Sequence, residues 1–169
     1  MEDFIHLHVH TYYSILDGQS SIKRLVDKAV KDGMKGMAVT DHGDMFGIKE
    51  FHDICNGVNK QRKKDGLEPF KPIFGCEMYV ARYGPKEQKN GKQDQSGYHL
   101  IVLAKNYKGY KNLIKLVSNS WTDGYYMRPR TDRADRSATT RGLSSVRLVL
   151  PVRCPRRFST ATWPEHARP

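Results

Sequence analysis

Two histidines near the N-terminus have the spacing of metal ligands. His8 and His10 are separated by Val9 within the run Ile5–His10, in which apolar and polar residues alternate. Such alternation predicts a β-strand, and residues two apart in a strand project from the same face. Both imidazoles would therefore converge from one side. A His-x-His pair alone is more often an ordinary surface or core feature, so it indicates a metal site only together with further ligands.

Further side chains of the ligand type lie near the ends of other expected strands. His42 follows the apolar run Gly36–Thr40, and Glu77 lies late in the run Lys71–Val80. In β/α architectures, ligands gather at the carboxyl ends of the strands. His99 fits this rule less well because it lies at the start of its strand. The complete set of candidate metal ligands is His8, His10, Asp17, His42, Glu77 and His99.

This set predicts a site for two or three divalent cations whose natural chemistry is phosphoester hydrolysis. Histidine and carboxylate ligands suit zinc, manganese or iron, and the absence of Cys ligands argues against a purely structural zinc site. Ion clusters lower the pKa of a bridging water and clamp the attacking and leaving oxygens of a phosphate ester. We expect His6 and His52 to stay outside the site. His6 lies one alternate position before the His8–His10 pair, and His52 faces out of a helix.

Strands alternate with helices up to about Asp135, which predicts an α/β fold with a parallel sheet or an α/β barrel. Ser20 or Ser21 can cap the first helix, and Gly33 can end it. We expect strands over residues 5–10, 36–40, 71–80 and 98–104, and helices over residues 20–33, about 46–63 and about 107–121.

Two segments lack apolar periodicity. Residues 84–95 are polar and rich in Lys and Gln, which predicts a mobile surface loop. Residues 136–169 contain seven Arg, no Lys and many Ser, Thr and Pro residues, with Glu165 as the single acid. This composition predicts a disordered, Arg-rich C-terminal tail that lacks packed contacts with the rest of the chain.

The bulk properties exclude several classes of protein. More than half of the net charge of +11 comes from the Arg-rich tail, so the charge is weak evidence for nucleic-acid binding. The three cysteines have no CxxC spacing, which argues against a disulfide framework or a Cys-type zinc site. The acidic, His-rich start is not a signal peptide, and no run has the length of a membrane span. We therefore expect a cytoplasmic protein with no membrane partner.

The motifs His-Leu-His-Val-His-Thr, Thr-Asp-His-Gly and Gly-Cys-Glu-Met-Tyr-Val resemble those of the PHP (polymerase and histidinol phosphatase) superfamily. Residues 4–135 further resemble the PHP domain at the N-terminus of the α subunit of bacterial DNA polymerase III. The resemblance implies the front part of a distorted (β/α)7 barrel with up to three metal ions. By position it assigns His8 and His10 to the first family motif, Asp17 to an acidic ligand, His42 to the second motif, Glu77 to the third and His99 to the fourth strand.

The resemblance also implies a function. The parent would be a DNA-directed DNA polymerase, a nucleotidyltransferase that acts in DNA replication with DNA and other replisome subunits. The PHP domain itself would supply metal-dependent phosphoesterase chemistry of a 3′–5′ exonuclease type, with zinc as the favoured ion and a metal-bound water as the reactive group. A stand-alone PHP phosphoesterase of the histidinol-phosphatase type is the alternative, which the polymerase-like segments disfavour. A non-enzymatic nucleic-acid-binding role for the tail is weaker still, because the tail has no interleaved aromatic residues.

The sequence departs from the family after Asp135, where relatives continue with a further Cys ligand and, much later, an Asp-x-His motif. We interpret residues 1–135 as a partial PHP domain and residues 136–169 as an out-of-frame translation of the same gene. On this interpretation the chain is a fragment, and we expect it to be inactive both as a polymerase and as a phosphoesterase.

Overall fold

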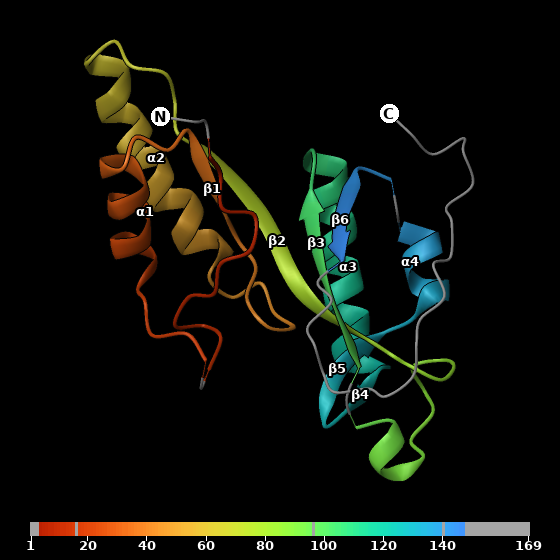
Figure 1. The fold of residues 1–169 in the computed structure, drawn as a ribbon. Coiled ribbons are helices and arrows are strands. Elements are labelled where there is room, and N and C mark those ends of the chain that lie inside the picture. The colour runs from red at the N-terminus through yellow and green to blue at the C-terminus, as the bar shows by residue number, and fades with distance from the viewer. Residues whose placement is uncertain (1–3, 16, 96, 140, 148–169) are drawn as a thin grey trace.

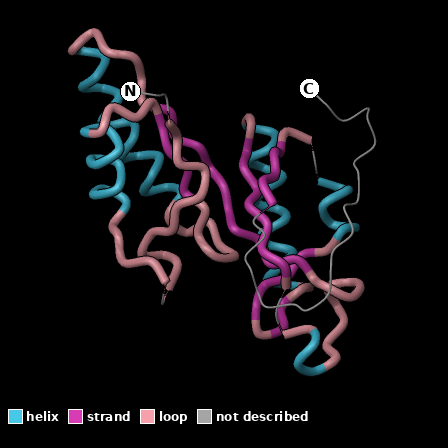
Figure 2. Tube along the Cα trace, in the orientation of Figure 1, coloured by secondary structure: helices cyan, strands magenta, loops and turns pink. Residues whose placement is uncertain are grey.

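The computed structural model describes residues 4–15, 17–95, 97–139 and 141–147. In Figure 1 the long strand β2 runs between one group formed by α1, α2 and β1 and a second group that includes β3, β6 and α3; Figure 2 shows the same arrangement by element type. In these described ranges no helix is both long and apolar enough to cross a membrane. The elements in chain order are α1 (Ile22–Lys31), β1 (Gly36–Val39), α2 (Ile48–Lys64), β2 (Lys71–Val80), the 3-10 turn η1 (Gly91–Gln93), β3 (Tyr98–Ala104), α3 (Tyr107–Thr122), β4 (Tyr125–Tyr126), β5 (Arg128–Thr131), α4 (Arg133–Thr139) and β6 (Leu143–Arg147).

The first hydrophobic core forms where α1 and α2 pack together beside β1. Ser21 begins α1, and its side chain accepts a hydrogen bond from the backbone N–H of Arg24, as an N-cap residue should. Gly33 follows the helix with a φ of 76°, a left-handed conformation that glycine adopts without strain. The buried members of this core are Ile22, Val26, Ala29, Met37, Val39, Ile48, Phe51, Cys55 and Phe70. Their packing fixes β1 and the turn that follows it.

The second hydrophobic core forms where α3 crosses β2 and β3. The helix begins at Asn106, whose side chain accepts a hydrogen bond from the backbone N–H of Gly109. The buried residues of this core are Cys76, Met78, Leu100, Val102, Leu113, Leu116 and Val117. The core therefore holds the second half of β2 and most of β3 against the same helix.

The sheet is mixed, and β2 is its central strand. The first half of β2 pairs in parallel with β1, the second half pairs antiparallel with β3, and its end pairs in parallel with β5. β3 also pairs antiparallel with β6. The predicted α/β class is confirmed, but the expected parallel sheet is wrong at β3. The connection between β2 and β3 contains no crossover helix, so β3 returns against β2 rather than alongside it. Closure into a barrel stays a prediction.

The segment Ile5–His10 lies beside β1 through a single bridge from His6 to Met37 and does not form the regular strand that its alternation predicted. The backbone N–H of Ala38 donates to His6 O at 2.8 Å, and the backbone N–H of Thr40 donates to Val9 O at 2.9 Å. The N–H of Val9, however, donates to the side-chain Oγ1 of Thr40 at 3.0 Å. Because a side chain takes the place of a backbone acceptor, the ladder is interrupted beside β1.

The segment 84–95 lies largely at the surface, as expected, but it is anchored at three of its backbone oxygens; its mobility stays a prediction. Arg130, with 1% of its surface exposed, donates guanidinium hydrogen bonds to the backbone oxygens of Lys86 at 2.6 Å, Gln88 at 2.8 Å and Asp94 at 2.8 Å. Lys86 and Asp94 are themselves buried. The loop thus supplies backbone carbonyl groups to a buried guanidinium cation.

Regular structure also continues past Asp135. β6 pairs with β3 from Leu100↔Arg147 to Ala104↔Leu143, and Leu143 packs against the second core. The expectation that residues 136–169 lack packed contacts is therefore wrong for β6. Composition misled here, since a strand of five residues needs little periodicity to pair with an existing sheet edge. Residues 148–169 of the expected tail lie outside the described residues, and their out-of-frame origin stays a prediction.

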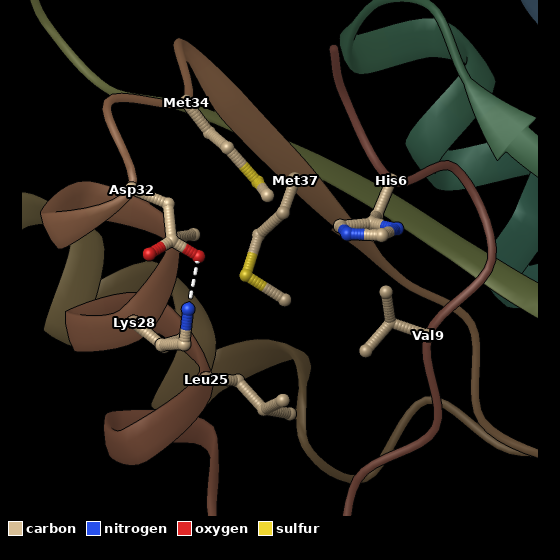
Figure 3. A pocket seen from close by; sticks show the side chains of 8 residues that line it. His6, Val9, Leu25, Lys28, Asp32, Met34 and Met37 are labelled. Atoms are coloured by element: carbon tan, nitrogen blue, oxygen red, sulfur yellow. Dashed lines mark hydrogen bonds and ion pairs between the residues drawn. The ribbon is translucent and has the colours of Figure 1, made fainter.

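A mainly apolar pocket of about 350 Å³ lies between α1 and the N-terminal segment. Figure 3 shows His6 and Val9 on one side of it and Leu25 on the other, with the ion pair of Lys28 and Asp32 at its edge. His6 therefore lines this pocket and stays outside the group of candidate ligands, as expected.

Candidate metal centre

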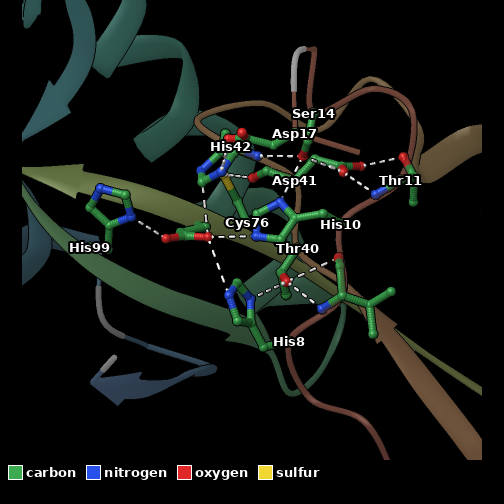
Figure 4. A network of polar contacts seen from close by, with 12 residues as sticks. His8, His10, Thr11, Ser14, Asp17, Thr40, Asp41, His42, Cys76 and His99 are labelled. Atoms are coloured by element: carbon green, nitrogen blue, oxygen red, sulfur yellow. Dashed lines mark hydrogen bonds and ion pairs between the residues drawn. The ribbon is translucent and has the colours of Figure 1, made fainter. Parts of the chain in front are cut away.

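Glu77 is the centre of the candidate site. Its side chain is buried, and its Oε2 lies 2.8 Å from His10 Nε2, 3.4 Å from His8 Nε2 and 3.5 Å from His42 Nδ1. Its Oε1 contacts His99 Nδ1 at hydrogen-bond distance. In Figure 4 the imidazoles of His8 and His10 come from the N-terminal segment, that of His42 from the turn after β1, and that of His99 from β3. The structure thus brings together five of the six side chains that the sequence selected.

Strand pairing accounts for the position of each ligand. His8 and His10 lie beside β1 through the hydrogen bonds of the N-terminal segment. His42 forms a bridge with Glu77, where the Gly43 N–H donates to Glu77 O at 2.9 Å. His99 lies opposite Tyr79, two residues after Glu77, because β3 is antiparallel to β2. The start of β3 and the end of β2 therefore share one edge, which explains why a residue at a strand start joins the site.

Asp17 lies at the outer side of the cluster. Its Oδ2 is 2.9 Å from His42 Nε2, and its side chain is 65% exposed. It contacts the cluster through His42, whose other ring nitrogen faces Glu77. Asp17 therefore lies outside the side chains that surround Glu77, and its role as a ligand stays a prediction.

The donor atoms fall into two overlapping groups that fit divalent cations. His8, His10 and Glu77 form one group, and His42, Glu77 and His99 form the other, with the ligand atoms of each group within 4.8 Å of one another. Within the described residues, buried His42 Nδ1 has no hydrogen-bond partner, and buried Glu77 Oε2 has only its contacts with the ring nitrogens of His8, His10 and His42. Unpartnered buried polar atoms are costly, and both are atoms that a cation would engage.

The electrostatics of the cluster also favour a cation. Burial alone would raise the pKa of the Glu77 carboxyl, but its contacts with His10 and His99 outweigh burial and hold that pKa well below its usual range. Burial lowers the pKa of His8 and of His42, which favours their neutral, ligating form. Burial opposes protonation of His10 too, but its hydrogen bond with Glu77 outweighs this and raises its pKa. The raised pKa of His10 thus reflects its contact with the same Glu77 carboxylate that a cation would engage.

Sequence reasoning missed the polar residues that support the ligands. Asp41, with 2% of its surface exposed, accepts hydrogen bonds from Thr11 and Ser14, and Ser14 also contacts His10. Thr40 plays a similar part beside His8, at 2.9 Å from its Nδ1. The signal available in the sequence was the Thr-Asp pair directly before His42, which places two buried polar residues at the end of an apolar strand.

This fold and this group of His and Glu side chains define the class of the protein: the chain belongs to the PHP domain family, whose model matches residues 6–150. Its relatives include DNA polymerase III α subunits. That of Borreliella burgdorferi is 45% identical over 140 residues, covering 83% of this chain and 11% of the relative. That of Treponema pallidum is 46% identical over 132 residues, covering 76% and 10%. That of Thermus aquaticus is 38% identical over 156 residues, covering 90% and 12%.

The chain spans about a tenth of the length of these relatives. Among solved structures, it aligns with a protein from Bifidobacterium adolescentis described as a metal-dependent phosphoesterase. The alignment covers 71% of this chain and 34% of the other, with 19% sequence identity and a TM-score of 0.45.

Proposed function

We propose that this PHP domain binds divalent cations around Glu77 and that its chemistry is phosphoester hydrolysis of a 3′–5′ exonuclease type. The observation that carries the proposal is the sharing of one buried carboxylate by two groups of histidines. Sharing of this kind is what two neighbouring ions require, since a carboxylate has an oxygen for each. Zinc suits the His-rich donor set best, and manganese or iron is compatible with it.

The position of each candidate ligand indicates which cation it would bind. His8 and His10 would hold one cation with Glu77, and His42 and His99 would hold a second, while Asp17 would extend the site outward from His42. Bound cations would supply Lewis acidity toward a phosphate ester and would make a bound water more acidic. The cluster histidines are half-buried, so the site stays open to a substrate on one side.

The whole protein is proposed to be the α subunit of a replicative DNA polymerase, which acts in the cytoplasm with DNA and other replisome subunits. The relatives named as DNA polymerase III α subunits support this proposal. For the residues described here we propose metal binding with little hydrolysis, because the family site draws on further ligands, a Cys and an Asp-x-His motif, beyond these six residues.

Calorimetric titration of the metal-free protein with zinc tests the metal site. We expect the wild-type chain to bind zinc and His10→Ala to bind it at least about tenfold more weakly, because a ligand is lost. His52→Ala is the matched control, since His52 is an exposed histidine on α2 that contacts Asp53 and lies outside the cluster. A wild-type protein that binds none of zinc, manganese and iron would contradict the proposal.

A second assay compares substrates. A 3′-mismatched primer strand and histidinol phosphate are incubated with the zinc-loaded and manganese-loaded protein, with His10→Ala as the blank. Release of nucleotides that depends on His10 supports the exonuclease type. Release of phosphate from histidinol phosphate alone would favour the stand-alone phosphatase instead.

A further inference from the structure

Asp41 is a buried carboxylate whose two oxygens both accept hydrogen bonds. Its Oδ1 accepts from the Thr11 backbone N–H at 2.6 Å and from Ser14 Oγ at 2.7 Å, and its Oδ2 accepts from Thr11 Oγ1 at 2.8 Å. An ionised carboxylate can only accept. The single hydrogen of the Ser14 hydroxyl is therefore committed to Asp41.

This commitment determines what Ser14 can do toward its other neighbours. Ser14 Oγ lies 3.1 Å from the His42 backbone N–H and 2.7 Å from His10 Nδ1. A backbone N–H is always a donor, and with its own hydrogen in use the hydroxyl can only accept from the imidazole as well. The hydrogen in the contact with His10 must therefore sit on Nδ1. The lone pair of neutral His10 is then left on Nε2, the atom that faces Glu77 Oε2 at 2.8 Å.

A parallel arrangement holds His8. Thr40 Oγ1 lies 3.2 Å from the carbonyl oxygen of Val9, which can only accept, and 2.9 Å from His8 Nδ1. The hydroxyl hydrogen of Thr40 can go to Val9 O, which also accepts from the Thr40 backbone N–H, or to His8 Nδ1. The contact with Thr40 therefore orients the His8 ring, with Nε2 toward Glu77, but does not fix its tautomer as Ser14 fixes that of His10.

We propose that Asp41 acts through the Ser14 hydroxyl as a positioning residue, keeping the His10 proton on Nδ1 so that Nε2 is available to a cation. Asp41 touches no reacting atom on this proposal. The inference deepens the proposed function, since the available nitrogen matters only if a cation binds there. Hydrogen-bonded partners of this kind typically change metal affinity by about 10-fold to 100-fold.

The experiment reads the tautomer directly. Nitrogen NMR of ¹⁵N-histidine-labelled, metal-free protein reports which ring nitrogen of His10 carries the proton. The spectra are recorded at pH 9 to 10 to favour the neutral imidazole. We expect Nδ1–H in the wild type and a shift toward Nε2–H in Ser14→Ala. Zinc affinity should fall by about 10-fold to 100-fold in the same variant. Ser14→Thr retains a hydroxyl and should restore both properties.

Substitutions of Asp41 and Ser118 separate the effect of the Asp41–Ser14–His10 hydrogen bonds from a general effect on packing. Asp41→Asn keeps an oxygen acceptor for Ser14 and should preserve the Nδ1–H form, whereas Asp41→Val removes the acceptor and should not. Ser118→Ala removes an exposed hydroxyl from α3 and should change neither readout. Thermal unfolding confirms that each variant compared is folded, and Ser14→Ala with Ser14→Thr suffices if Asp41→Val does not fold.

The proposal is overturned if wild-type His10 carries its proton on Nε2, or if Ser14→Ala leaves Nδ1–H unchanged. Failure of the proposed function has a different signature. In that case the wild type binds no cation, yet substitution of Ser14 still changes the tautomer of His10. The hydrogen bonds from Asp41 through Ser14 to His10 would then exist without a metal site.

Discussion

The indole of Trp121, near the end of α3, donates a hydrogen bond from Nε1 to the backbone oxygen of Gly43 at 2.7 Å. Gly43 follows His42 directly and has a φ of 64°, so this contact ties the second core to a turn of the metal site. Pro129 closes the other side, since a Cβ at Gly43 would lie 2.6 Å from Pro129 Cγ. The turn that carries His42 is thus held from two elements distant in sequence.

Removal of the indole N–H should loosen that turn without unfolding the chain. For Trp121→Phe we expect zinc affinity to fall by roughly tenfold, because the carbonyl of Gly43 loses its partner and His42 is less firmly oriented. Calorimetric titration measures the change. Tyr125→Phe is the control, since Tyr125 stacks on Trp121 at a ring distance of 5.5 Å and makes no contact with Gly43 among those described. Equal affinities for wild type and Trp121→Phe would show that the contact is irrelevant to the site.

The number of ions that a variant binds should depend on whether the lost ligand belongs to one of the two ligand groups or to both. We expect His99→Ala to lose one ion and retain the one held by His8 and His10, and Glu77→Gln to lose both because the shared carboxylate becomes a neutral amide. Elemental analysis of dialysed protein gives the stoichiometry. Retention of full metal content by Glu77→Gln would remove Glu77 from the centre of the site.

Asp44 should make stability depend on pH. Burial raises the pKa of its carboxyl to about 6, above the value of 3.8 for an unperturbed group. The stabilisation that Asp44 contributes is therefore fully present below pH 3.8 and is lost as the pH rises through about 6. Asn keeps the acceptor for the Phe46 N–H and carries no charge. In metal-free protein, Asp44→Asn should be more stable than wild type above pH 7, by about 2 to 3 kcal/mol.

Urea unfolding at pH 5 and pH 8 measures this difference, which should shrink at the lower pH. Asp53→Asn is the control, because Asp53 is an exposed carboxyl on α2 whose pKa is lowered by its hydrogen bond with Lys49. It should show no gain at pH 8. A gain for Asp44→Asn that is the same at both pH values would rule out the titration of Asp44 as its cause.

Arg130 should determine the order of the segment 84–95. Arg130→Met leaves the carbonyl groups of Lys86, Gln88 and Asp94 without their donor, so we expect a loss of about 3 kcal/mol in unfolding free energy. Cleavage by trypsin at the lysines of the segment should become faster. Arg128→Met is a matched control, because Arg128 is an exposed arginine on the same strand that packs over Tyr79. Unchanged cleavage in Arg130→Met would contradict the anchoring role.

Elements that bury a continuous apolar run were predictable from sequence, and relationships between elements were less so. β2 and β3 have the bounds that their apolar residues indicated, Lys71–Val80 and Tyr98–Ala104. The direction of β3 was not evident, because apolar content says nothing about whether a strand returns or crosses over. His99 therefore looked misplaced until the antiparallel register put it beside Glu77.

The supporting residues of the site were hidden for a different reason. Ser14 and Asp41 are common residue types, and their role depends on hydrogen bonds between segments far apart in the chain. Arg130 likewise resembled any basic residue, although it is buried against backbone carbonyls. Ligand-type residues at strand ends can be recognised from the local sequence. The residues that orient them can be identified only from the tertiary structure.

The position of β2 between the two hydrophobic cores has a consequence for how the protein folds. Ligands at residues 8, 10 and 42 arrive with the first core and the ligand at residue 99 arrives with the second, so no early intermediate with one core contains the complete site. Contacts between such distant residues form slowly, because a long loop must close before they are gained. Zinc added during refolding would thus report the moment at which the two cores have docked, and the cluster would serve as an internal marker of finished folding.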